Sequence, residues 1–329
     1  MRKTLLTILT ILTLLTYIET ANSSNLNLTI TTNKQLYNVG ESVTIMGSLT
    51  QDGTPLSDGL VAIQVKTPKN ATFIIRTFTT GQTPTGPWPI EITNFTPCDS
   101  NGNPTYTFQP GGQIGFKFTI KNSAATSYDV IVPINLYYAN GAPFSIFIAY
   151  NGTINANSKI TSMIWPLSIP TDAVKGTAYA YANALSDLPE NMGLPYSPEN
   201  SANFTIGTAS ASTPQTSSSA GTFNITFPLK SVPIYLGNYT INAATRYPPS
   251  SFPFTTAYTK STFNVALIAD LNNDYKVDVK DVSIAAKAFG TMPGDSKWNP
   301  IADLNKDNKV DMKDISIVAK AFGAVALDP

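Results

Sequence analysis

The sequence predicts a multidomain chain, mostly of β-structure, that ends in a small α-helical module. In the first 265 residues, apolar and polar residues alternate over short segments separated by turn residues, and Thr, Ser, Asn, Tyr and Phe are abundant. The last part of the chain contains one acidic phrase twice, and apolar residues at helical spacing follow each copy. The acidic residues are also concentrated in this last part of the chain, because residues 266–329 hold 10 of the 21.

The acidic phrase is an internal duplication. Residues 269–290 read ADLNNDYKVDVKDVSIAAKAFG, and residues 302–323 read ADLNKDNKVDMKDISIVAKAFG. The two copies agree at 17 of 22 positions and repeat with a period of 33 residues. A single copy would fit a solvated turn equally well, but the duplication favours a specific role for the phrase.

Oxygen-bearing residues recur in each copy at the spacing that Ca²⁺ needs. This cation takes about six to eight oxygen ligands, and a twelve-residue loop supplies them from positions 1, 3, 5, 7, 9 and 12. The sequence therefore predicts two bound calcium ions. The expected ligands in the first loop are Asp270, Asn272, Asp274, the backbone carbonyl of Lys276, Asp278 (through water) and Asp281, and those in the second loop are Asp303, Asn305, Asp307, the backbone carbonyl of Lys309, Asp311 and Asp314.

Local patterns predict the structure around the two loops. A helix is expected after each loop, over residues 282–289 and 315–322, and each helix should end at the glycine that follows. Val277 and Val310, at position 8 of the loops, are expected to turn inward and to pair the two loops through a short β-bridge.

Position 6 of the loop, where the chain bends sharply and Gly is usual, is Tyr275 in the first copy and Asn308 in the second. Asn tolerates a left-handed backbone, whereas Tyr adopts it with strain. The first calcium site is therefore expected to be the weaker of the two.

Each unit is a loop followed by a helix, without a preceding amphipathic helix and with Asp at position 12, so both differ from an ordinary EF-hand. The stretch 267–329 resembles a type I dockerin module, the paired loop–helix calcium unit that attaches secreted proteins to cohesin modules. The resemblance implies partner-binding surfaces at loop positions 10 and 11, which are Val279 and Lys280 in the first copy and Met312 and Lys313 in the second. It also implies binding in either of two orientations about half a turn apart. Self-association and cell-surface attachment are the alternative roles for such a pair.

The N-terminus predicts export. Arg2 and Lys3 precede an apolar run over residues 5–18, and small polar residues follow, which is the pattern of a secretory signal peptide over residues 1–23. Cleavage is expected after Ser23 or, alternatively, after Ala21, and an uncleaved signal anchor is the other interpretation. The protein is expected to be secreted and extracellular or at the cell surface, with membrane contact only through the signal peptide during export.

The β-region is expected to contain several units. Residues 24–86 predict an immunoglobulin-like sandwich, because the phrase YNVGESV at 37–43 and the alternating strand that follows resemble a macroglobulin-type domain. Residues 87–207 predict a second β-sandwich. Residues 208–221 are expected to form a Ser/Thr-rich linker or loop. Residues 222–266 have too few strands for a sandwich of their own, so they are expected either to share a sheet with a neighbouring unit or to form a β-rich partial module. The predicted fold is thus a series of all-β immunoglobulin-like sandwiches followed by a small α-helical, calcium-binding, dockerin-like module.

Composition argues against several classes of function. A formal net charge of zero gives no electrostatic footprint for nucleic acid. The single Cys98 excludes an intramolecular disulfide, and the absence of His excludes Ser-His-Asp and Cys-His chemistry. Glycoside hydrolysis usually needs two carboxylates about 5 to 9.5 Å apart. The acids upstream of the repeats are sparse, and Asp187 and Glu190, the closest pair in sequence, lie in a turn-like phrase. No enzymatic activity is therefore expected.

Three functions remain compatible with the sequence. The first is a non-catalytic exported protein that attaches to a cohesin-type partner, with the sandwiches as spacer or adhesion modules. The second is a carbohydrate-binding accessory subunit of an extracellular polysaccharide-degrading assembly. The third is a structural protein of the cell envelope. Polysaccharide binding needs a row of exposed aromatic residues, for which the candidates are Trp88, Trp165, Tyr137, Tyr138, Tyr179 and Tyr181, although a core position is favoured for Tyr179 and Tyr181.

Overall fold

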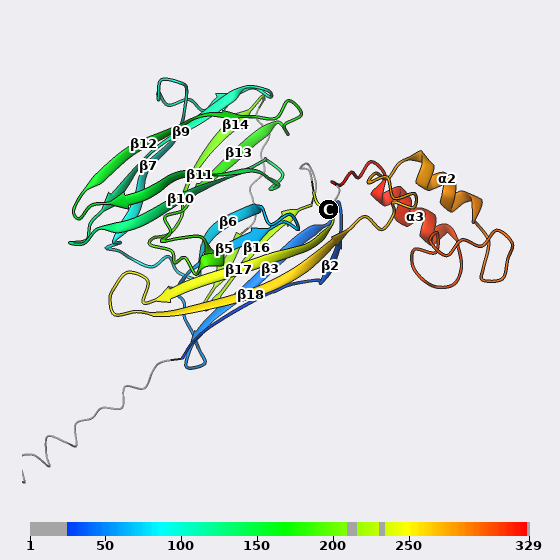
Figure 1. Cartoon of the computed structure of the whole chain (residues 1–329), viewed down its shortest axis with the longest axis horizontal. Coiled ribbons are helices and arrows are strands. Elements are labelled where there is room, and N and C mark those ends of the chain that lie inside the picture. The colour runs from blue at the N-terminus through cyan, green and yellow to red at the C-terminus, as the bar shows by residue number, and fades with distance from the viewer. Residues whose placement is uncertain (1–24, 209–215, 230–233, 328–329) are drawn as a thin grey trace, which may run out of the picture.

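The structure is a computed structural model that describes residues 25–208, 216–229 and 234–327. Two β-sandwiches stacked on each other form the body, and a small helical module lies at one end (Figure 1). Within the described residues, no helix has the length and apolarity needed to span a bilayer. The signal peptide expected over residues 1–23 lies outside the described residues.

The first sandwich consists of two sheets. The strands of one sheet are β1 (Leu26–Thr32), β3 (Ser42–Gln51), β4 (Thr54–Pro55), β15 (Thr216–Ser219) and β16 (Thr222–Pro228), and those of the other are β2 (Leu36–Asn38), β5 (Leu60–Lys66), β6 (Thr72–Thr79), β17 (Gly237–Tyr247) and β18 (Thr255–Ala266). The first sheet has the order β1-β3-β16-β15 with β4 paired to β3, and the second has the order β2-β18-β17-β5-β6.

Burial along the strands follows from which faces are covered. In β1, Leu26, Leu28 and Ile30 alternate with exposed residues and face the core, as expected for a strand with one solvent face. β5 is buried along its whole length. The second sandwich covers its outer face through a small apolar cluster of Ala62, Ile75, Ile131 and Leu185.

Residues 24–86 and 222–266 do not form separate units, which corrects the expected domain boundaries. β16 pairs with β3, and β17 lies between β5 and β18. The hydroxyls of Thr44 and Thr226, which are 182 residues apart in sequence, lie 2.9 Å from each other. The two segments share both sheets because neither contains enough strands to bury its own apolar face. Residues 216–219 of the expected linker form strand β15, and residues 209–215 lie outside the described residues.

The second sandwich is inserted between β6 and β15 of the first. Its strands are β7 (Ile90–Cys98), β8 (Thr107–Phe108), β9 (Gln113–Asn122), β10 (Tyr128–Tyr137), β11 (Pro143–Ile154), β12 (Lys159–Ser168), β13 (Gly176–Ala182) and β14 (Asn200–Ile206), and a 3-10 helix, η1 (Pro189–Asn191), precedes β14. One sheet has the order β12-β9-β7 and the other β11-β10-β13-β14-β8. Cys98 is a buried free thiol, whose pKa burial raises.

Buried polar contacts join the two sandwiches. Arg76 on β6 is 2% exposed, and its Nε and Nη2 donate to Glu199 at 2.8 and 2.5 Å. Burial opposes the charge on Arg76, but the carboxylate of Glu199 outweighs this effect, so the pKa of the guanidinium is raised. Lys66 forms a second ion pair, with Glu190. Two ion pairs and the apolar cluster around Ala62 and Ile131 therefore join the two sandwiches.

Two of the candidate sugar-stacking residues lie in this interface. The guanidinium carbon of Arg76 lies 3.4 Å from the ring centroid of Tyr181 and 5.3 Å from that of Tyr137. Tyr137 is buried, and burial raises its pKa to about 12. These two rings pack between the sandwiches, so they are not part of an exposed aromatic row.

Candidate functional site

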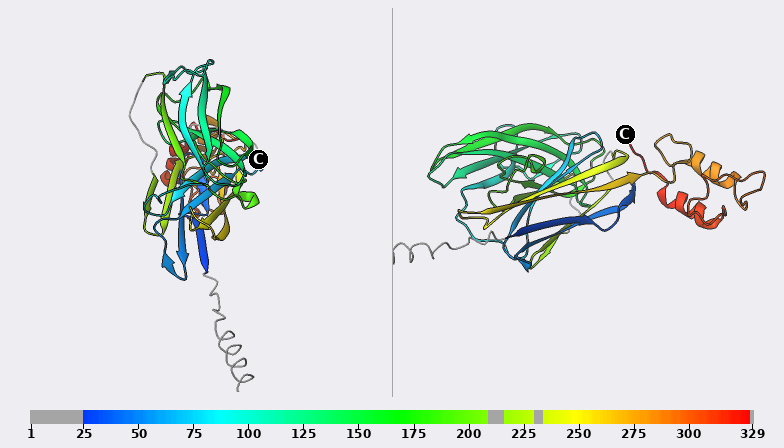
Figure 2. Two further views of the ribbon diagram at one scale, coloured as in Figure 1. Left: turned by 90° about the vertical axis from the view of Figure 1, so that its left-hand side faces the viewer. Right: turned by 60° about the horizontal axis from the view of Figure 1, so that its bottom comes forward.

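Two helices and their preceding loops make up the module, which projects from the end of the first sandwich (Figure 2). The helices are α2 (Val279–Lys287) and α3 (Met312–Ala321). Both begin three residues earlier than expected, because each has a capping box at its N-terminus. Asp278 accepts from the amide of Lys280 while Asp281 accepts from the amide of Asp278, and the second helix repeats this arrangement.

Backbone N–H groups of the first loop donate to its own carboxylates. Asp270 accepts from the amides of Asp274 and Tyr275 at 3.1 and 2.8 Å. Asp281 accepts from the amide of Leu271 at 2.7 Å, so the end of the loop is tied to its beginning. A carboxylate has about four lone-pair positions, so each of these groups retains sites for a cation.

The second loop repeats these hydrogen bonds at the equivalent positions. Asp303 accepts from the amides of Asp307 and Asn308 at 3.1 and 2.9 Å, and Asp314 accepts from the amide of Leu304 at 2.8 Å. The duplicated sequence therefore produces a duplicated arrangement of carboxylates.

Each loop contains two residues with a left-handed backbone. At position 6, Tyr275 has φ 63° and Asn308 has φ 65°. At position 4, Asn273 has φ 57° and Lys306 has φ 58°. The expected sharp bend is thus present in both copies, and Tyr275 adopts a conformation that a β-carbon disfavours. The weaker first site remains a prediction.

The loops pair with the ends of the opposite helices rather than with each other, which corrects the expected bridge between Val277 and Val310. The amide of Val277 donates to the carbonyl of Ala324 at 2.9 Å, and the amide of Val310 donates to the carbonyl of Thr291 at 3.0 Å. Both valines are buried, as expected. Each loop is therefore braced by the segment that follows the other loop's helix.

The oxygen donors of the loops fit a hard cation. Each set combines carboxylates, an Asn side chain and a backbone carbonyl, the mixture that Ca²⁺ takes. Among the described residues, no three Asp, Glu, His or Cys side chains are gathered into a ready metal cluster. In the first loop, the Nζ of Lys280 lies 3.0 Å from Oδ2 of Asp274, to which the side-chain Nδ2 of Asn272 also donates. The hydrogen bond from Lys280 lowers the pKa of Asp274, so this carboxylate is ionised at neutral pH.

The four expected partner-binding residues lie in the first turns of the helices rather than in loops. Val279 is 66% exposed and Met312 is 67% exposed, and the side chains of Lys280 and Lys313 are also exposed. All four side chains are therefore accessible, and their role in binding a partner remains a prediction.

The C-terminal tail connects the module to the first sandwich. The amide of Leu327 donates to the carbonyl of Ile234 at 2.7 Å, and the amide of Ala326 donates to the carbonyl of Tyr275 in the first loop at 3.0 Å. At the start of the module, the amide of Ile268 donates to the side chain of Asn38 at 3.3 Å.

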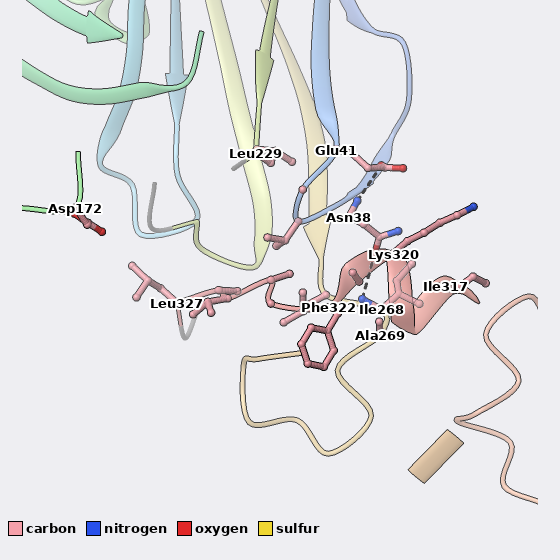
Figure 3. A pocket seen from close by; sticks show the side chains of 18 of the residues that line it. Asn38, Glu41, Asp172, Leu229, Ile268, Ala269, Ile317, Lys320, Phe322 and Leu327 are labelled. Atoms are coloured by element: carbon pink, nitrogen blue, oxygen red, sulfur yellow. Dashed lines mark hydrogen bonds between the residues drawn. The ribbon is translucent and has the colours of Figure 1, made fainter. Parts of the chain in front are cut away.

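A cavity of about 860 Å³ lies between the module and the first sandwich, and Ile317 and Lys320 of α3 line it (Figure 3). The end of α3 therefore faces the sandwich.

Comparisons with known proteins identify the module but not the sandwiches. Residues 268–323 match the family model described as Dockerin type I domain, which covers both loops and both helices. No curated protein matches the chain.

The matching solved structures are distant. They include alkylpurine DNA glycosylase AlkC of Pseudomonas fluorescens bound to DNA containing an abasic site analogue, with 13% identity over 37% of this chain and 32% of that chain and a TM-score of 0.29. The C-terminal domain of wzt gives 11% identity over 38% and 78%, with a TM-score of 0.31. A β-glucosidase of Listeria innocua in complex with glucose gives 9% identity over 40% and 17%, with a TM-score of 0.24. The chain spans about a third of the length of the glycosylase. Matches this weak carry no argument about function.

Ten of the twelve expected ligands lie in the two loops, whereas the closing ligands Asp281 and Asp314 lie in the first turns of α2 and α3, and the roles of all twelve in binding remain predictions. Sequence reasoning missed the capping boxes, although an Asp followed three residues later by a second Asp carries that signal in each copy. It also missed the pairing of the tail with Ile234, for which the sequence contains no local signal.

Proposed function

We propose that this chain is a non-catalytic exported protein that attaches to a cohesin-type partner through its calcium-dependent C-terminal module. Two findings that concern the same segment support the proposal. The segment that matches the type I dockerin domain is the segment in which two loops hold their carboxylates by the same set of backbone hydrogen bonds. Two calcium ions would bind, one in each loop.

Different residues of the module would bind calcium and contact the partner. The loop carboxylates, the Asn side chains and the carbonyls of Lys276 and Lys309 would hold the ions. Val279, Lys280, Met312 and Lys313 would contact the partner. A cation in the first loop would compete with Lys280 for Asp274, and this competition would free the amine for the partner's surface. When bound, calcium supplies a cross-link between oxygens that are distant along the loop.

The environment of the upstream acids supports a non-catalytic role for the sandwiches. Glu199 and Glu190 pair with Arg76 and Lys66 in the interface between the sandwiches. Oδ1 of Asp187 accepts from the amide of Leu188 and from Asn191. These acids stabilise local structure, so we assign the immunoglobulin-like sandwiches a spacer or adhesion role in a secreted or cell-surface protein.

Calcium titration and partner binding test the proposal. Isothermal titration of the calcium-free full chain should give two ions, with the weaker site assigned to the first loop. Full chain in calcium should bind a panel of immobilised cohesin modules, and chelator should abolish that binding. Asp281→Ala combined with Asp314→Ala should abolish both calcium binding and cohesin binding, because each change deletes a closing ligand and a capping contact.

Asp295→Ala is the matched control, since Asp295 lies between the two loops and its carboxylate accepts from the nearby amide of Met292. This variant should bind calcium and cohesin as the unaltered chain does. Cohesin binding that persists in chelator, or a chain that takes up no calcium, would refute the proposed function.

A further inference from the structure

A cleft between the two sandwiches has the features of a ligand site. It lies where the hairpin loop between β17 and β18 meets the loops that begin β7 and β10 of the second sandwich. Its volume is about 280 Å³, and Trp88, Tyr128, Arg246, Phe252 and Phe254 contribute to its walls. Ligand pockets usually have about 300 to 1,000 Å³, so this one suits a small group or the end of a longer chain.

The cleft contains a buried positive charge without a carboxylate partner. Arg246 is 5% exposed, and among the described residues no acid forms an ion pair with it. Its Nη2 donates to the carbonyl of Tyr196 at 3.3 Å, but its Nε is buried without an acceptor. Burial lowers the pKa of Arg246, although a guanidinium remains protonated at physiological pH. A buried, uncompensated charge is costly, whereas an anion in the cleft would compensate it.

The neighbouring acid does not serve Arg246. Asp129 follows Tyr128 at the start of β10, but its Oδ1 accepts from the hydroxyl of Thr153 at 2.6 Å. The contrast with Arg76 is direct, because that arginine has a bidentate carboxylate partner inside the same pair of sandwiches. Within the part of the chain that the structure describes, no carboxylate compensates Arg246, so its charge is available to an external anion.

Aromatic rings surround the charge and extend to the surface. The guanidinium carbon of Arg246 lies 5.4 Å from the ring centroid of Tyr196 and 5.3 Å from that of Phe254. Phe252, which is 86% exposed, meets Phe254 edge to face with their centroids 5.8 Å apart. An exposed phenylalanine beside a cleft provides a flat apolar surface on which a ring can stack.

We propose that this cleft binds a uronic acid residue of an acidic polysaccharide. The planar carboxylate of the sugar suits the guanidinium of Arg246, and the apolar face of the pyranose ring suits Phe252 and Trp88. A neutral sugar would leave the charge uncompensated, and a purely apolar ligand would bury it further. The site does not depend on the proposed function of the C-terminal module.

The position of the cleft agrees with this assignment. The hairpin loop between β17 and β18 lies at the end of the first sandwich opposite to α2 and α3 (Figure 1). A partner bound to the module would therefore leave the cleft accessible to a polymer.

Matched oligosaccharides test the proposal on the full chain in excess calcium. Trigalacturonate and triglucuronate are titrated by calorimetry, and their methyl esters, which keep the size but lose the charge, serve as the comparison. At least one acid should bind, and its ester should bind at least about ten-fold more weakly, because a charged hydrogen bond is lost. Failure of both acids to bind, or equal binding of acid and ester, would overturn the proposal.

Variants then locate the binding. Phe252→Ala should weaken binding by about five-fold or more without changing the melting temperature, since the side chain is exposed. Phe289→Ala is the matched control, because Phe289 is a half-exposed phenylalanine on the distant module, and it should bind as the unaltered chain does. Arg246→Met should abolish the preference for acid over ester. If Arg246→Met does not fold, Phe252→Ala and the ester comparison still decide, and unchanged affinity of Phe252→Ala would exclude the cleft.

Discussion

The ion pairs of this protein differ in whether their charged side chains are buried or exposed. Arg76 and Lys66 are buried with carboxylate partners from the second sandwich, whereas Lys34 and Glu41 form an exposed pair on the first. Breaking a buried pair leaves an uncompensated charge inside the protein, while breaking an exposed pair exposes both groups to water. The contribution of an ion pair to the free energy of unfolding therefore depends on its burial, and not only on the distance between its charged atoms.

Glu199→Gln tests this difference. The substitution keeps the shape of the side chain but leaves Arg76 buried without its counter-charge, so we expect a loss of about 3 to 5 kcal/mol in the free energy of unfolding. Glu41→Gln is the matched control, and its pair is worth about 1 kcal/mol or less. Denaturant unfolding of the full chain in calcium measures both. Equal losses for the two variants would mean that the interface does not depend on this pair.

The helices and strands show what local sequence can predict and what it cannot. Periodic apolar residues predicted both helices, but not their first turns, because Val279 and Met312 are exposed and lie outside the buried face, and Lys280 and Lys313 are charged. The capping boxes set those starts. Alternation likewise predicted strands in residues 24–86 and 222–266, but no local signal says that β16 pairs with β3 across an inserted sandwich. The ligand positions were readable because those of each site lie within one segment of twelve consecutive residues.

The two helices, although nearly identical in sequence, face different surroundings. The end of α3 lines the cavity against Asn38 and Glu41 of the first sandwich, whereas no residue of α2 lines that cavity (Figure 3). A cohesin-type partner that approached along α3 would meet the sandwich. We therefore expect Val279→Asp with Lys280→Glu to weaken cohesin binding by about ten-fold or more, and Met312→Asp with Lys313→Glu to weaken it by about three-fold or less. Biolayer interferometry on the full chain measures both, and equal effects would mean that both orientations are accessible.

The whole molecule consists of parts with very different sources of stability. The sandwiches have cores of large apolar and aromatic side chains, including Phe116, Phe223 and Tyr239. The module has two short helices, and its buried apolar residues are mostly small, such as Ala285, Ala288 and Val318. A unit of this size seldom has enough apolar core to fold without a metal or a disulfide. The module also holds the densest acidic charge in the chain.

Chelation should therefore unfold the module over residues 267–329 and leave the sandwiches folded. At a free calcium concentration of about 100 times the dissociation constant, binding stabilises the folded state by about 2.7 kcal/mol per site. Without the ion, the loop carboxylates would also repel one another. Calorimetry of the full chain should give two unfolding transitions. Chelator should strongly lower the midpoint temperature of the module's transition, which circular dichroism identifies by its loss of helical signal. The tail contact between Leu327 and Ile234 couples the two parts, so the sandwich transition should move by no more than a few degrees. A single transition that chelator does not change would mean that the loops do not depend on calcium.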